Sequence, residues 1–121
     1  MNLDEFFAPY PDSRPIFDRV LEAAQALGAV QLRVTRSQVA LVRERPFAWA
    51  WIPEKYLRRK AAPLVLSFSF RESRPWPRWK EITEAAPHRF THHLELWSAE
   101  DMDEAAQGWL REAWETSGAS R

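Results

Sequence analysis

The chain has 121 residues and no cysteine, 45% of its residues are hydrophobic and 13% aromatic, and its formal net charge is zero. This composition predicts one compact domain over residues 1–121, and it excludes a disulfide scaffold and a thiolate metal site. No apolar run approaches the roughly 18 residues of a membrane span, and the acidic N-terminus lacks the apolar core of a signal peptide, so we expect a soluble, cytoplasmic protein with no membrane partner.

The first thirty residues are predicted to be mostly helical. Residues 1–11 form an apolar segment with two prolines near its end, and we expect a short helical turn that docks on the core. Apolar residues then recur at helical spacing over 16–27, with Asp12 or Ser13 as the N-cap and Gly28 as the stop.

Alternation of apolar and polar residues predicts strands in the middle of the chain. The ranges are 30–35, 38–43, 47–52 and 64–70. The segment 71–88 is a long connection rich in proline and cations, and within it 80–85 fits either a turn of helix or an edge strand.

Residues 89–97 give the clearest alternation and are predicted to form the central strand. One side of it carries Phe90, His92, Leu94 and Leu96. Ser98 then caps a C-terminal helix whose apolar stripe runs over 102–114, and residues 116–121 are expected to fray.

The order of these elements predicts an α+β fold. We expect a two-layer sandwich in which a largely antiparallel five-stranded sheet has the N- and C-terminal helices on one face. The other face is then open, and its predicted residues are Gln31, Arg33, Ser67, Ser69, Thr91, His93, Glu95 and Trp97.

The charge is distributed unevenly along the chain. Residues 1–30 carry two arginines against five acids, a net −3, and residues 91–121 carry two against seven, a net −5. The middle, 31–90, carries thirteen cations against five acids, a net +8. Zero overall charge argues against a general nucleic-acid binder, whereas the basic middle favours an anionic partner. Nucleic acid is therefore neither assigned nor excluded as a partner.

Basic residues interleaved with aromatic ones in the middle of the chain have the composition of a surface that neutralises phosphates and stacks bases. The candidate ligand-binding residues are Arg33, Arg36, Arg58, Arg59, Trp76, Arg78, Trp79, Lys80, Arg89 and His93. A second interpretation stays open, in which these cations pair with acids of the terminal helices and the two tryptophans pack their loop onto the core.

Within this set, Arg33 and His93 are both out of phase with the apolar residues of their strands. We therefore predict that both lie on the open face as neighbours, and that His93 gains charge there near pH 6.5.

The sequence contains no recognisable catalytic or metal motif. His92 and His93 are adjacent in a strand and point to opposite faces, so they cannot share one ion, and we expect no metal and no cofactor. His92 is predicted to be hydrogen-bonded in the core. Only three glycines are present, none in a phosphate-binding loop, and no nucleophile has a recognisable partner, so no catalytic residue is assigned.

Three segments resemble a small uncharacterised bacterial family of unknown function, common in actinobacteria and sometimes labelled a predicted transport protein. They are 32–40 (LRVTRSQVA), 77–81 (PRWKE) and 89–96 (RFTHHLEL). The resemblance covers nearly the whole chain, and it implies no catalytic or binding role for any residue.

These observations favour a non-enzymatic binding module that recognises an anionic group, in a nucleotide, a short single strand or a protein partner, through the open face and the basic loops. The alternative is a structural or interaction domain that forms a homodimer through the open face. A small enzyme of unknown reaction is the third hypothesis.

Overall fold

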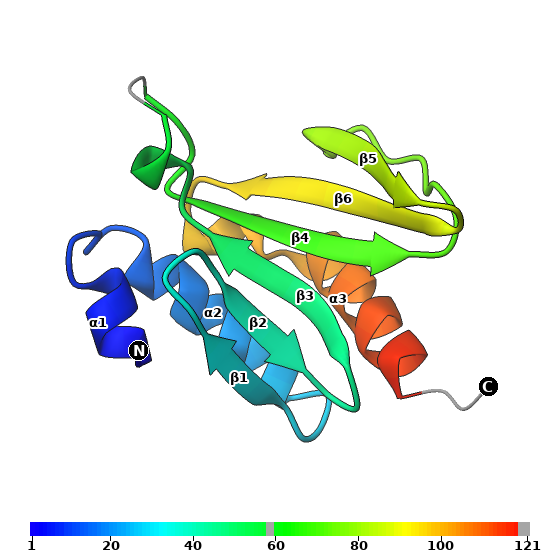
Figure 1. The fold of residues 1–121 in the computed structure, drawn as a ribbon, viewed down its shortest axis with the longest axis horizontal. Coiled ribbons are helices and arrows are strands. Elements are labelled where there is room, and N and C mark those ends of the chain that lie inside the picture. The colour runs from blue at the N-terminus through cyan, green and yellow to red at the C-terminus, as the bar shows by residue number, and fades with distance from the viewer. Residues whose placement is uncertain (58–59, 119–121) are drawn as a thin grey trace.

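The computed structural model describes residues 1–57 and 60–118. It has an α+β architecture in which a six-stranded antiparallel sheet, with strand order β1-β2-β3-β4-β6-β5, is covered on one face by helices α2 and α3 (Figure 1). The helices are α1 (Leu3–Phe7), α2 (Arg14–Gln25) and α3 (Glu104–Ser117), with short 3-10 turns η1 (Pro53–Lys55) and η2 (Ala99–Asp101). The strands are β1 (Gln31–Val34), β2 (Val39–Val42), β3 (Pro46–Trp51), β4 (Leu64–Phe70), β5 (Glu81–Ala86) and β6 (Arg89–Leu96).

The fold class predicted from the sequence is confirmed, but the predicted number of strands is wrong by one. The additional strand is β5, which pairs with β6 at the edge of the sheet, so of the two alternatives for residues 80–85 the edge strand is observed. Its residues are exposed or half-buried, and Ile82 is its only large apolar residue. An edge strand with so little buried surface lacks the alternation that identifies a strand from sequence.

The pairing register confirms the predicted phase of the other strands. Leu41, Ala48, Phe68 and His92 lie directly opposite one another in successive strands. All four are buried. Because directly paired residues share a face, this row marks the side of the sheet that α2 and α3 cover.

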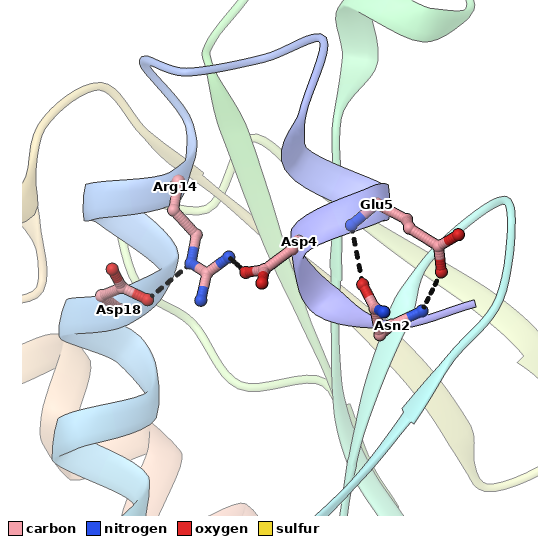
Figure 2. A network of polar contacts seen from close by, with 5 residues as sticks. All are labelled: Asn2, Asp4, Glu5, Arg14 and Asp18. Carbon is pink, nitrogen blue, oxygen red and sulfur yellow. Dashed lines mark hydrogen bonds and ion pairs between the residues drawn. The ribbon is translucent and has the colours of Figure 1, made fainter.

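The N-terminal segment is joined to the rest by polar contacts around α1 (Figure 2). Oδ1 of Asn2 accepts a bond from the Glu5 amide at 2.8 Å, and Oε1 of Glu5 accepts one from the Asn2 amide at 3.0 Å, which forms a capping box. Arg14 of α2 donates to Asp4 and to Asp18, each at 2.9 Å. The Arg14–Asp4 ion pair joins α1 to α2, and both phenylalanines of α1 are buried in the core.

The C-terminal helix begins later than the sequence predicts. Ser98 makes no capping bond and precedes η2, whereas Asp103 is the N-cap of α3 and accepts a bond from the Ala106 amide at 3.0 Å. The carboxylate of Asp101 accepts a bond from the Trp97 amide at 2.8 Å, so the chain turns once before the helix starts. The helix continues through Ser117, past the start of the tail expected to fray, and residues 119–121 lie outside the described part.

Candidate functional site

The two tryptophans of the basic loop lie on the helix-covered side of the sheet. The ring centroids of Trp76 and Trp79 are 5.9 Å and 5.4 Å from that of Trp109 in α3, and Trp79 is 5.8 Å from Phe68. Both tryptophans are half-buried against the core. The structure therefore places them where the packing interpretation puts them, away from the open face.

Two cations of the same loop make ion pairs with acids of the last helix and its cap. Arg78 donates to Asp103 at 2.7 Å and to the carbonyl oxygen of Asp101 at 2.8 Å. Arg74 forms an ion pair with Glu112. These contacts follow the interpretation in which basic residues of the middle pair with the acidic C-terminal helix.

The remaining candidates of the basic middle are scattered. Arg33 is in edge strand β1, Arg36 is in the turn that follows it, and Lys80 immediately precedes β5; all three are exposed. Arg58 and Arg59 lie outside the described residues.

Arg33 and His93 share the open face, but the prediction that they are neighbours is wrong. The register pairs Arg33 with Ala40, Ala40 with Trp49, Trp49 with Ser67, and Ser67 with His93. Adjacent strands lie roughly 4.8 Å apart, so four steps separate the two residues by about 19 Å. Alternation along a strand determines which face a residue occupies, whereas the order of strands determines its neighbours.

His93 lies at the end of a hydrogen-bond chain that crosses three strands of the open face. Nε1 of Trp51 donates to Oγ of Ser67 at 3.0 Å, and this Oγ lies 2.7 Å from Nδ1 of His93. When the hydroxyl donates to Nδ1, the indole N–H and the hydroxyl hydrogen both have an acceptor, and the neutral ring carries its proton on Nε2. Burial lowers the pKa of His93, while the charge of Glu81 opposes the shift, so the expected gain of charge lies below pH 6.5.

His92 is buried in the core, as predicted, and both of its ring nitrogens are bonded. Nδ1 lies 3.0 Å from the carbonyl oxygen of Phe90, to which it donates, and Nε2 accepts from the Arg74 amide at 2.9 Å. Burial lowers the pKa of His92, which keeps the ring neutral. In residues 1–57 and 60–118, no three His, Asp or Glu side chains gather as a metal site.

Two adjoining hollows open on and beside the uncovered face. The first, of about 260 Å³, is called the aromatic hollow, and its lining is Gln38, Trp49, Trp51, Ser67, Ser69, Arg89, Thr91 and His93. The second, of about 360 Å³, is called the cationic hollow, and its polar lining includes Arg45, Ser69, Arg71, His88, Arg89 and Thr116. Trp49, Ser69 and Arg89 line both.

The residues that line the cationic hollow come from the start of β3, the end of β4, the start of β6 and the C-terminal end of α3. These four ends can be followed in Figure 1. Its arginines come from these strand ends, since Arg45 precedes β3, Arg71 follows β4 and Arg89 opens β6. No acidic residue lines it among the described ones, and none forms an ion pair with these three arginines. Arg45 also donates to the carbonyl oxygen of Thr116 at 3.1 Å, which helps to cap the end of α3.

Of the predicted candidates that the structure describes, Arg89 and His93 line these hollows, while Arg45, Arg71 and His88 are not among the predicted residues. These residues are far apart along the chain and meet only because β3, β4 and β6 are neighbours in an antiparallel sheet. The available signal is local: each arginine sits at one end of a predicted strand. His88 has φ 60°, in the left-handed region, within the turn that joins β5 to β6.

In the described part of the chain, no helix has the length and apolar character needed to cross a membrane.

The profile of the domain of unknown function DUF5655 matches residues 4–117. No curated protein and no solved structure matches the chain. The profile match covers nearly the whole sequence and confirms the expected membership of a family of unknown function. This chain therefore belongs to the DUF5655 family.

Proposed function

We propose that this domain is a non-enzymatic binding module that recognises an anionic group at the cationic hollow. The observation that carries this proposal is the convergence of Arg45, Arg71 and Arg89 with His88 around one hollow of about 360 Å³ that no described acid lines. Guanidinium groups present planar, paired N–H donors that match carboxylate and phosphate oxygens.

The electrostatics of the hollow favour an anion. The positive charges around the hollow repel one another, and folding is what brings them together. A bound anion relieves this repulsion in the folded state and has no such effect on the unfolded chain. Arg71 and Arg89 are exposed, so their attraction for an anion is screened by salt. We therefore expect binding that stabilises the fold and weakens as ionic strength rises.

The proposal includes that the domain catalyses no reaction, and the geometry of the Ser67–His93 pair on the open face supports this part. Ser67 is only 3% exposed and lies in the middle of β4. Its hydroxyl oxygen accepts a bond from Trp51 as well as contacting His93. A serine nucleophile needs a hydroxyl oxygen free to attack, and this nearly buried one is already engaged by Trp51.

The proposal is tested by thermal unfolding in the presence of phosphate, sulfate or chloride at low and high ionic strength. We expect phosphate and sulfate to raise Tm at low ionic strength, and we expect Arg71→Ala and Arg89→Ala to reduce that rise. Arg33→Ala is the matched control, because it removes an exposed arginine from the same sheet at a distant edge.

Two results would contradict the proposal. One is an absence of stabilisation by any anion, and the other is an equal effect in all three variants. Size-exclusion chromatography with light scattering completes the test: a salt-insensitive dimer that no anion stabilises would favour the homodimer through the open face instead.

A further inference from the structure

The cationic hollow does not end at its arginines but continues into a second hollow of different chemistry. Arg89 and Trp49 line both, so the two hollows lie side by side. The aromatic hollow adds Trp51 to Trp49, and both are half-buried tryptophans on the uncovered face of β3. The arrangement suits a molecule with an anionic group at one end and an aromatic group at the other.

The number of available charges indicates which anion fits the cationic hollow. Arg45 already donates to the carbonyl oxygen of Thr116 at the end of α3, whereas the guanidinium groups of Arg71 and Arg89 make no hydrogen bond to any described residue. Two guanidinium groups balance a dianion better than a single carboxylate, and their forked donors suit the oxygens of a phosphate monoester.

The aromatic hollow is suited to a planar group that carries hydrogen-bond acceptors. Trp49 and Trp51 supply aromatic surface, on which a base can stack whatever its identity. In the tautomer in which the Ser67 hydroxyl donates to Nδ1, the Nε2 proton of His93 has no bond to any described residue. That proton is a donor for an acceptor on the ligand.

Size also indicates a ligand that uses both hollows. Small-molecule sites generally enclose roughly 300–1,000 Å³. The aromatic hollow, at about 260 Å³, is below this range, and the cationic hollow, at about 360 Å³, is near its lower end. Only the two together reach well into it, and the zero net charge of the chain does not favour a long polyanion.

We propose that the ligand is a nucleoside monophosphate, with its phosphate in the cationic hollow and its base in the aromatic hollow. This inference rests on the proposed function and goes further, because it assigns a role to Trp51 and His93, which anion binding alone does not require.

Isothermal titration calorimetry distinguishes the proposal of anion binding from the proposal that the ligand is a nucleoside monophosphate. The titrants are AMP, GMP, CMP, UMP and inorganic phosphate, each at low ionic strength. Stacking on an aromatic side chain is worth roughly five- to 150-fold in affinity per base, so at least one nucleotide is expected to bind at least about fivefold more tightly than phosphate. If all four bind no more tightly than phosphate, the nucleotide inference is overturned while anion binding stands. If nothing binds, both fail.

Variants at the two ends separate the contributions. Trp51→Leu and His93→Ala, which alter only the aromatic hollow, are expected to lower nucleotide affinity severalfold and to leave phosphate affinity unchanged. Arg89→Ala is expected to weaken both, and Arg33→Ala to weaken neither. The inference is overturned if both aromatic-hollow variants, with folding verified by circular dichroism, bind the nucleotide as tightly as the parent does.

Discussion

His92 is a titratable group held neutral inside the core, and this links the stability of the fold to pH. Its ring is fully buried, donates to the Phe90 carbonyl and accepts from the Arg74 amide, so neither nitrogen is free for an added proton. Protonation of Nε2 would break the bond from the Arg74 amide. Arg74 lies near the start of the loop that carries Trp76 and Trp79. Burial, the main cause, and the nearby charge of Arg74 both lower the pKa of His92.

The sign of the pH effect follows from that lowered pKa. In the unfolded chain the histidine titrates near its ordinary value of about 6.5, so below this pH the unfolded state binds more protons than the folded state. The free energy of unfolding, measured in urea, should therefore fall between pH 7.5 and pH 5.5. His93, whose pKa is also lowered by burial, contributes in the same direction.

Two histidine variants assign this effect to a residue. We expect His92→Gln to show a smaller fall in stability between the two pH values than the parent does. His88→Asn, a change at an exposed histidine to a residue that tolerates the same left-handed turn, should keep the full fall. A fall of equal size in His92→Gln and the parent would contradict the assignment.

At the scale of the element, the start of α3 depends on one carboxylate. Asp103 accepts a bond from the Ala106 amide, one of the helix N–H groups that has no partner within the helix, and the negative charge is favourable at this end of the helix. Ser98 has the residue type of a cap and the expected spacing to an acid, but it makes no such bond.

This difference gives a matched pair of substitutions. Asp103→Ala should destabilise the protein by about 0.5–2 kcal/mol, because it removes the cap and also the ion pair with Arg78. Ser98→Ala should change stability by less than about 0.5 kcal/mol. Urea unfolding of both variants provides the measurement, and a larger loss at Ser98 than at Asp103 would show that the helix start is wrongly placed.

Most elements could be predicted from the sequence because their buried faces make apolar residues recur at regular spacing. Strand β4 was predicted with the observed bounds, and β6 to within one residue, since alternate residues of both lie under the helices. Strand β5 buries too little to show the pattern, and α3 starts at its N-cap, Asp103, and not at the predicted cap, Ser98. Both are decided by tertiary contacts that one sequence does not reveal.

At the scale of the whole molecule, the candidate site is a product of strand order. The sequence could place Arg33 and His93 on one face, but it could not show that β1 lies at one edge while β6 lies between β4 and β5. For the same reason it could not bring Arg45, Arg71 and Arg89 together. The loop with the densest basic and aromatic composition instead packs on the helix side of the sheet, where Arg78 and Arg74 pair with acids.

The central claim is that an anion binds where these strand ends meet, and mapping that site by NMR tests it most directly. Inorganic phosphate is titrated into ¹⁵N-labelled protein at low ionic strength, and amide shifts are followed in ¹H–¹⁵N spectra. We expect saturable shifts centred on the amides of residues 45, 71, 88 and 89, with those of 31–34 in β1 unchanged. Shifts centred on β1, shifts that grow without saturation across the surface, or no shifts at all would contradict the claim.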